Sequence, residues 1–290
     1  MLAFAMAKEK SRDLGSPIWI LQGDFGRSML NFMSRPLVEH AHAQFNLLFK
    51  MGGADAEFVV DGKSHILTDD TVLLFNPWLP HAKTGNSQGP TLVLSLLVEQ
   101  RWLGGLMTSV PANLDRAFPE PLVIRTPEVD LHARRLTAAG SQNVTMPDAV
   151  CLEVVRDLVQ EVVTAYASPQ TSRDFVSNAR PIDFRIRKAL GYIHQHALEN
   201  PRIAEIAQEV GLSRSRFFEQ FRRCVGASPH HYIDWARMAE ATRALSSTEK
   251  PLIDVSEELG FSSHSHFTRF FAQHIGISPS EFRRQAVVLT

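Results

Sequence analysis

A stretch of about thirty residues occurs twice in this chain, roughly fifty residues apart. The first copy runs from residue 203 to 232 and the second from residue 252 to 282. The offset is 49 residues at Gly211/Gly260 and 50 residues at Phe221/Phe271, so the second copy has gained one residue. A repeat at this distance is typical of a duplicated supersecondary unit. The C-terminal part of the chain is therefore predicted to contain one helical motif twice.

Each copy has the pattern of two short helices around a tight corner. Apolar residues at helical spacing lead to Gly211 or Gly260, where a left-handed residue can end the first helix. Ser213 and Ser262 are predicted to cap the second helices. This pattern predicts either helix-turn-helix units, whose second helix can lie in a DNA major groove, or two ordinary helical hairpins. The duplication favours helix-turn-helix units. The segment 232–247 between them is long enough for a helix of roughly 24 Å.

The segments GLSRSRFFEQFRRCVGASP and LGFSSHSHFTRFFAQHIGISPSEFRR resemble the double helix-turn-helix domain of AraC-type transcriptional regulators. The resemblance covers residues 182–286, and its ending is its most specific part. It implies that double-stranded DNA is a partner and that the second helix of each unit contacts it. The implied DNA-binding residues are Arg214, Ser215, Phe218, Glu219 and Arg222 in the first unit, and Ser263, His264, Ser265, Thr268 and Arg269 in the second. Glu219 can accept from cytosine and Phe218 can pack on a thymine methyl, although neither attracts phosphate.

Residues 18–98 have a different pattern, with short β-type runs broken by Gly, Asp and Pro. Asp61–Gly62 between two such runs predicts a hairpin. Many short strands at this spacing predict a small sandwich or jelly roll. The order from HAHAQF to NPWLPHA resembles the cupin-like sensing domain of many AraC-type regulators. The resemblance implies a small organic effector as a second partner.

The predicted fold class is therefore α+β with two domains. A cupin-like β-barrel or jelly roll with a helical dimerisation segment is followed by an all-α domain with two helix-turn-helix units. The predicted boundaries are a poorly ordered N-terminus at 1–17, the sensing and dimerisation domain at 18–167, a linker at 168–181, and the DNA-binding domain at 182–290.

A long amphipathic helix is predicted over residues 149–167, with an apolar stripe that contains Cys151, Val155 and Leu158. The stripe has two interpretations. It packs on its own barrel, or it forms the homodimer interface that the family resemblance implies.

Three histidines are the most distinctive candidate binding residues of the N-terminal part. His40 and His42 lie two residues apart in a predicted strand, so both imidazoles and Gln44 point to one side. His81, from a later strand, could join them in the barrel interior. Three interpretations stay open: ligands of a divalent metal, the lining of an effector pocket, or structural hydrogen bonding.

The neighbours of the histidines bear on that choice. Phe75 and Trp78, beside His81, favour an apolar or aromatic effector and are predicted to be ligand-binding residues. Cupin metal sites also use a glutamate a few residues after the histidine pair. Here an apolar run stands at that place, and Glu57 is the nearest candidate but lies too far along the chain. No cofactor is required by this pattern.

Charge and composition limit the class of protein further. The formal net charge is −1, but residues 1–167 hold 14 basic and 18 acidic residues, a balance of −4, and the remainder holds 16 and 13, a balance of +3. A basic C-terminal half has the sign expected of a DNA-binding part. No apolar run approaches the ~18 residues of a membrane span, and the opening lacks the charge order of a signal peptide, so we expect a cytoplasmic protein.

The function predicted from these observations is a ligand-responsive transcriptional regulator without enzyme activity. The alternative is a metal-dependent cupin enzyme fused to a helical domain. A purely structural interaction module is disfavoured, because it would not explain why both copies keep the helix-turn-helix pattern.

Overall fold

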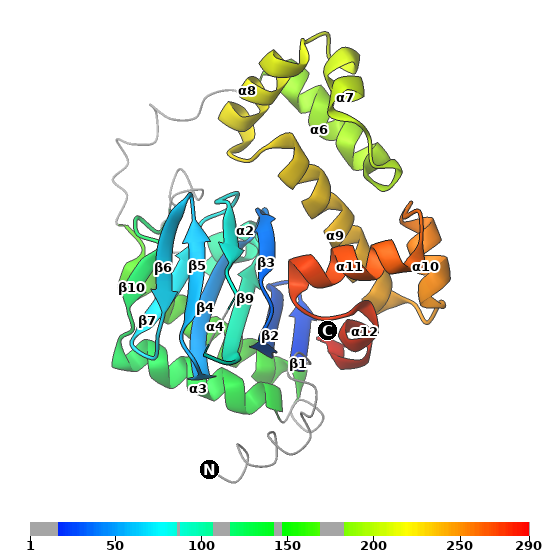
Figure 1. Cartoon of the computed structure of the whole chain (residues 1–290). Helices are drawn as coiled ribbons and strands as arrows, with labels where there is room; N and C mark the ends of the chain where they lie inside the picture. The colour runs from blue at the N-terminus through cyan, green and yellow to red at the C-terminus, as the bar shows by residue number, and fades with distance from the viewer. Residues whose placement is uncertain (1–16, 86–87, 107–116, 142–146, 169–182, 290) are drawn as a thin grey trace.

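The computed structural model describes residues 17–85, 88–106, 117–141, 147–168 and 183–289. The chain forms a sheet-rich N-terminal domain and a helical C-terminal domain (Figure 1). The predicted two-domain α+β organisation is therefore confirmed. The predicted N-terminal stretch 1–17 and linker 168–181 lie outside the described residues, except for Pro17 in the first strand and Ser168.

Two sheets build the N-terminal domain. The larger has the strand order β10-β7-β4-β9-β2-β1-β11 and the smaller has the order β3-β8-β5-β6. The strands of this domain are β1 (Pro17–Gly23), β2 (Gly26–Met33), β3 (Leu37–His40), β4 (Phe45–Gly53), β5 (Ala56–Val60), β6 (Lys63–Leu67), β7 (Thr71–Phe75), β8 (His81–Lys83), β9 (Thr91–Val98) and β10 (Leu122–Ile124). The predicted hairpin joins β5 to β6, with positive φ at Asp61 (47°) and Gly62 (76°), as a tight two-residue turn requires.

Alternation along the strands creates a core on each face of the larger sheet. In β4, Leu48 points into the core between the two sheets, where it joins Phe58 and Val93. Its neighbours Leu47 and Phe49 point the opposite way, into a second core. Because successive side chains of a strand alternate between faces, the continuous apolar run of β4 serves both cores.

The second core is closed by helices α3 (Pro127–Ser141) and α4 (Asp148–Tyr166). The apolar stripe of α4, including Cys151, Val155 and Leu158, is buried against α3 and the larger sheet. The stripe is therefore occupied within the chain and is not free to bind a second copy. The structure thus confirms that this stripe packs within its own domain. A shorter helix, α2 (Gln100–Leu106), follows β9.

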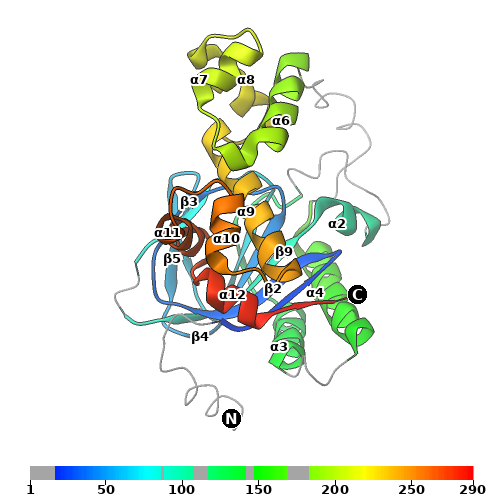
Figure 2. The same cartoon turned by 90° about the vertical axis from the view of Figure 1, so that its right-hand side faces the viewer.

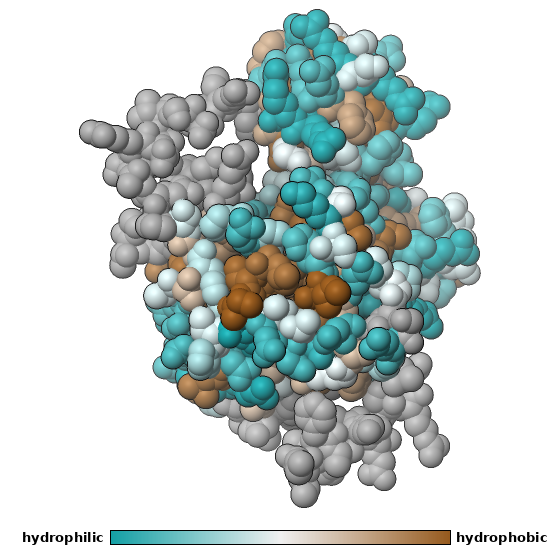
Figure 3. Space-filling model, turned by 60° about the vertical axis from the view of Figure 1, so that its left-hand side comes forward, coloured by the Kyte–Doolittle hydropathy of each residue, from teal (hydrophilic) through white to brown (hydrophobic). Residues whose placement is uncertain are grey.

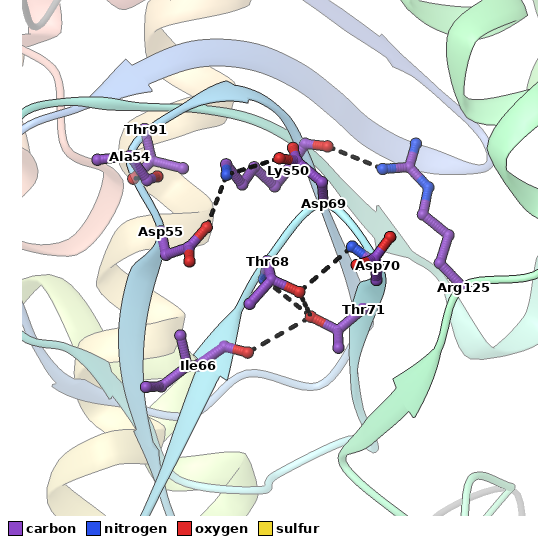
Figure 4. A network of polar contacts seen from close by, with 10 residues as sticks. All are labelled: Lys50, Ala54, Asp55, Ile66, Thr68, Asp69, Asp70, Thr71, Thr91 and Arg125. Atoms are coloured by element: carbon purple, nitrogen blue, oxygen red, sulfur yellow. Dashed lines mark hydrogen bonds and ion pairs between the residues drawn. The ribbon is translucent and has the colours of Figure 1, made fainter.

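Charged side chains form a hydrogen-bond and ion-pair network at one end of β4 (Figure 4). The ammonium group of buried Lys50 donates to Asp55 at 2.6 Å and to Asp69 at 3.1 Å. The Arg125 guanidinium donates to the Lys50 carbonyl at 2.8 Å. These bonds tie the end of β4 to the turns around it and to the segment after β10. Gln44, directly before the opposite end of β4, accepts a hydrogen bond from Trp235 of the helical domain.

The helical domain has two helix pairs at the two ends of one long helix, α9 (Figures 1 and 2). The elements are α6 (Phe184–His196), the 3₁₀ turn η2 (Ala197–Glu199), α7 (Ile203–Glu209), α8 (Arg214–Val225), α9 (Pro229–Ser247), α10 (Leu252–Glu258), α11 (His264–Ile275) and α12 (Pro279–Gln285). Each pair has its own apolar core, and Phe217 and Phe267 are fully buried in these cores. Gly211 and Gly260 have φ of 67° and 68°, so the left-handed corner predicted for both copies is confirmed.

The extra residue of the second copy lies in its corner. Ser213 caps α8 by accepting a hydrogen bond from the Arg216 amide. The equivalent cap of α11 is Ser263, which accepts from the His266 amide. The prediction that Ser262 caps the second helix is wrong, because the cap is set by the first helical residue and that residue is His264. The Ser262 hydroxyl instead lies 3.2 Å from Nδ1 of His266.

The last strand, β11 (Ala286–Val288), leaves the helical domain and pairs in parallel with β1, with Leu21 opposite Val287. The helical domain predicted to span 182–290 therefore does not include these last residues. The core of the second helix pair also takes in Ile20 and Met29 from β1 and β2. The second helix pair is thus packed directly on the sheet, whereas the first pair reaches the sheet-rich domain through Trp78.

Candidate functional site

The exposed face of α8 carries the residues predicted to bind DNA in the first unit. Figure 3 shows mostly hydrophilic residues over the upper, helical part of the molecule. One shallow depression on α8 is lined by all five predicted residues and by one that was not predicted: Arg214, Ser215, Phe218, Glu219, Arg222 and Arg223. Phe218 is 36% exposed, whereas its neighbour Phe217 is fully buried. The face thus offers three guanidinium groups, one carboxylate and one aromatic ring to a partner.

The start of α11 carries the predicted residues of the second unit. Ser263, His264, Ser265 and Arg269 are exposed. Thr268 is only half-buried, and its hydroxyl oxygen is buried without a hydrogen-bond partner in the described part of the chain. Four of the five residues are therefore accessible to a partner, and Thr268 is accessible in part.

An interior cavity of about 940 Å³ runs from between the two sheets to α9 and α11. His40, His42, Gln44 and His81 line it, as predicted. On the side of the helical domain it meets α9, whose Trp235 indole donates to the Gln44 amide oxygen at 3.2 Å. The Gln44 amide nitrogen in turn donates to Glu99 at 2.8 Å.

Phe75 and Trp78 do not line the cavity, so their predicted role as ligand-binding residues is not borne out by its geometry. Phe75 lies in the core between the sheets, where its ring stacks on His81 at 4.3 Å. Trp78 has a left-handed φ of 63°, and its ring points to the helical domain, where it stacks on Tyr232 at 5.0 Å and lies 5.1 Å from Trp235. Its function is to join the two domains.

Two cations that line the cavity, buried Lys83 and half-buried Arg27, were missed by the sequence analysis. Lys83 is 1% exposed and its ammonium group donates to the Thr84 carbonyl at 3.1 Å. No carboxylate forms an ion pair with Lys83 within the described ranges. Burial lowers the pKa of Lys83, and burial lowers the pKa of Arg27 to about 10. Lys83 stands two residues after His81 in β8, so the alternation that placed His81 inside also predicts Lys83 inside.

The three histidines meet at the wall of this cavity. Their candidate ligand nitrogens lie within 4.8 Å of one another. The ring centroids of His40 and His81 are 4.4 Å apart, and those of His42 and His81 are 5.0 Å apart. Burial, with smaller contributions from neighbouring imidazoles, lowers the pKa of His42 and of His81 to about 3. Burial and the charge of His81 also lower the pKa of His40. All three rings are therefore neutral at pH 7.

Glu57, the nearest candidate for a fourth, carboxylate ligand, lies elsewhere. Its side chain is exposed and accepts hydrogen bonds from Ser64 and Thr84. Glu57 therefore does not join the three histidines.

A family model described as a helix-turn-helix domain matches residues 206–285, which include α8, α9 and α11. The arabinose operon regulatory protein of Escherichia coli is 39% identical over 104 residues. The C-terminal part of this chain is an AraC-type helix-turn-helix domain. That match spans 36% of the chain and 36% of the relative, so just over a third of the relative's length is covered.

Two further similarities extend over most of the chain. The HTH-type transcriptional regulator YdiP of Escherichia coli is 23% identical over 251 residues, which is 85% of this chain and 80% of YdiP. The structure of unsaturated fatty acid bound ToxT from Vibrio cholerae has a TM-score of 0.53 at 14% identity and covers 92% of this chain and 93% of ToxT. At that identity the likeness concerns the fold, a sheet-rich domain followed by a helical one. Among the described residues, no helix is long and apolar enough to cross a membrane.

Proposed function

We propose that this protein is a sequence-specific, DNA-binding transcriptional regulator that responds to a small organic effector in the interior cavity. The observation that carries the proposal is the exposed polar face of α8 within the AraC-type domain, with its three arginines in one depression. Arginine binds phosphate and guanine edges in bidentate geometry, so such a face suits the DNA major groove.

Both helix pairs are proposed to be helix-turn-helix units that read DNA together. Their second helices start at equivalent positions, capped by Ser213 and Ser263, and the corner glycines have the same left-handed conformation. Helix α9 has 19 residues, which correspond to about 28 Å. With the width of the flanking helices added, this separation suits two major-groove segments about one DNA turn, or roughly 34 Å, apart.

The N-terminal domain is proposed to be a cupin-like sensor, and we expect the effector to combine an apolar body with a carboxylate. Buried Lys83 and half-buried Arg27 give the cavity two cations, and Met29, Leu48 and Phe58 give it apolar walls. ToxT, which has a similar fold, is described with a bound unsaturated fatty acid. Thermal-shift binding of a panel of carboxylates tests this class. We expect Lys83→Met to abolish the shift and Lys63→Met, an exposed lysine of β6, to keep it.

Helix α9 is proposed to transmit effector binding to the helices that contact DNA. Its residues Trp235, Met238 and Thr242 line the cavity, while its two ends hold the two helix pairs. An effector that moves α9 would therefore change how α8 and α11 are presented to DNA.

A homodimer is also part of the proposal. It was predicted to form through the 149–167 helix, and because the apolar stripe of α4 is buried within the chain, we propose that the contact uses the outer surface of α4. Light scattering on the purified protein measures whether such a dimer forms. The alternative of a metal-dependent enzyme has no support from the relatives described above, which are named as regulators.

The decisive experiment is the selection of genomic DNA fragments by the purified full-length protein at a stated salt concentration, since affinity for DNA depends strongly on salt. We expect enriched fragments to share two short sequence blocks about one helical turn apart. If the enriched fragments shared only one sequence block, only one of the two helix pairs would recognise a DNA sequence. If no fragment is enriched with or without effector candidates by a folded protein, the proposed function is wrong.

A further inference from the structure

We infer that His40, His42 and His81 form a binding site for a late first-row divalent cation, Zn²⁺ above all, in the wall of the interior cavity. The inference concerns ligand chemistry that regulation by an organic effector does not require. It stands on the geometry of the three imidazoles and does not depend on DNA binding.

The hydrogen bonds of the three rings orient them for metal binding. In each ring Nδ1 lies 2.8–2.9 Å from a backbone carbonyl, which is that of Val38 for His40, of Gln44 for His42 and of Leu79 for His81. A carbonyl only accepts, so Nδ1 must carry the proton in all three rings. Each Nε2 therefore holds a lone pair. An imidazole whose second nitrogen donates to a backbone carbonyl is the usual form of a metal-binding histidine.

Two of these Nε2 atoms have no hydrogen-bond partner in the described part of the chain. Nε2 of His42 and Nε2 of His81 are buried and make no hydrogen bond to any described residue. His42 is 8% exposed and His81 is 2% exposed. A buried polar atom without a partner costs free energy, so most such atoms in native proteins are paired. A cation between the rings would bind both orphaned nitrogens at once.

The backbone holds the three rings close together. His40 and His81 are directly opposite each other on the paired strands β3 and β8. The candidate nitrogens already lie within 4.8 Å of one another. Nitrogens bound to one tetrahedral Zn²⁺ at 2.0–2.1 Å would be about 3.4 Å apart. Metal binding would therefore shorten the distances between these nitrogens by up to about 1.4 Å.

Because all three candidate ligands are imidazoles, the site favours some metal ions over others. Neutral imidazoles suit Zn²⁺, Cu²⁺, Ni²⁺ and Fe²⁺, whereas Mg²⁺ and Ca²⁺ prefer oxygen ligands. Three protein ligands leave one tetrahedral position for water or for an anion in the cavity. His274 of α11 is close by, with its ring centroid 6.1 Å from that of His40. The ion would therefore lie where the sensor meets the second reading helix.

The test uses untagged full-length protein that has been stripped with a chelator and dialysed at neutral pH. Titration with Zn²⁺, read by calorimetry and by elemental analysis after gel filtration, should give one ion per chain and a raised melting temperature. Titration with Co²⁺ should give visible absorption of a four-coordinate nitrogen site without a thiolate-to-cobalt band, because Cys151 and Cys224 are not near the three histidines. Mg²⁺ should not bind.

Substitutions of the histidines test whether these residues bind the ion. We expect His42→Gln and His81→Gln each to weaken Zn²⁺ binding by at least about 100-fold, since even loss of an outer hydrogen bond costs about 10–100-fold. His132→Gln, in α3, should bind like the wild type. Circular dichroism of the metal-free proteins shows whether each variant is folded. No bound ion in the wild type, or equal Zn²⁺ affinity in folded His42→Gln, His81→Gln and wild-type protein, would overturn the inference.

Discussion

Trp235 of α9 donates its indole N–H to the side-chain oxygen of Gln44, 3.2 Å away, across the boundary between the helical and the sheet-rich domain. The two residues are 191 positions apart in the chain. Both line the interior cavity. A ligand in the cavity would therefore meet this hydrogen bond directly.

Removal of this bond should loosen α9. Gln44→Ala removes both the bond from Trp235 and the bond to Glu99, so we expect it to lower stability by about 2 kcal/mol, at about 1 kcal/mol for each bond. Amide exchange in 229–247 should become faster, as measured by mass spectrometry. Gln160→Ala, an exposed glutamine of α4, is the control and should change neither quantity. Unchanged exchange in Gln44→Ala would mean that other contacts alone hold α9 in place.

Two adjacent phenylalanines of α8 should separate folding from DNA binding. Phe217→Ala empties a fully buried position and should cost about 3–5 kcal/mol in chemical denaturation. Phe218→Ala changes a side chain that is 36% exposed, so its stability should change by less than about 0.5 kcal/mol, whereas its affinity for the selected DNA should fall. If Phe218→Ala bound DNA like the wild type, the exposed face of α8 would not be the reading surface.

Arginines on the two reading helices should matter for DNA and not for stability. Arg214→Ala and Arg269→Ala should each weaken binding to the selected DNA by roughly 1–3 kcal/mol if they contact bases, with relaxed sequence preference. A phosphate contact would instead give uniform weakening and a smaller salt dependence. Arg156→Ala, an exposed arginine of α4, is the matched control in fluorescence-anisotropy titrations. A loss in the control as large as in the two variants would contradict the assignment.

The caps of the reading helices make a local prediction. Ser213→Ala and Ser263→Ala each remove the acceptor of the first-turn amide and should cost about 1 kcal/mol in thermal or chemical unfolding. Ser262→Ala removes no cap and should cost clearly less. Equal costs at Ser262 and Ser263 would contradict the cap assigned to α11.

The buried histidines predict a loss of stability in acid. The pKa of His42 and of His81 is about 3 in the folded protein, against about 6.5 in an unfolded chain. Between these values the unfolded state binds more protons, so stability falls as the pH falls below about 6.5. Each histidine contributes a slope on the order of 1 kcal/mol per pH unit. Denaturation midpoints from pH 7 to 4 measure this, and the double variant His42→Gln/His81→Gln should flatten the curve. A wild-type curve without slope would contradict the burial of neutral rings.

Local patterns explain which features could be predicted from the sequence. The left-handed glycines 211 and 260, the cap at Ser213 and the hairpin at Asp61–Gly62 depend on a few neighbouring residues, and all were confirmed. His40 and His42 were expected on one face of a single strand, with His81 joining them from a later strand, and the three do meet. The strand ends at His40, however, so His42 and Gln44 are placed by the segment after β3 and the predicted strand alternation is wrong for them. The cap at Ser262 was wrong because the position of a one-residue insertion within a corner depends on where the next helix begins.

The remaining features depend on contacts between distant segments. The spacing of apolar residues in α4 shows that one face of the helix is buried. It does not show whether that face packs on the chain's own sheet or on a second copy. The pairing of β11 with β1 and the turning of Trp78 away from the cavity likewise arise from domain packing.

The sequence by itself thus determined the two helix pairs, the strand-rich N-terminal half and the residues that face outward on the reading helices, because hydrophobic period and turn chemistry act over a few residues. Only the tertiary structure decided that the cavity lies between the sheets and α9 and that Lys83 is buried at its wall beside half-buried Arg27. It also decided that three imidazoles share the cavity and that the Nε2 atoms of His42 and His81 are unpaired among the described residues. These properties depend on burial and on the meeting of distant surfaces, which exist only after the chain has folded.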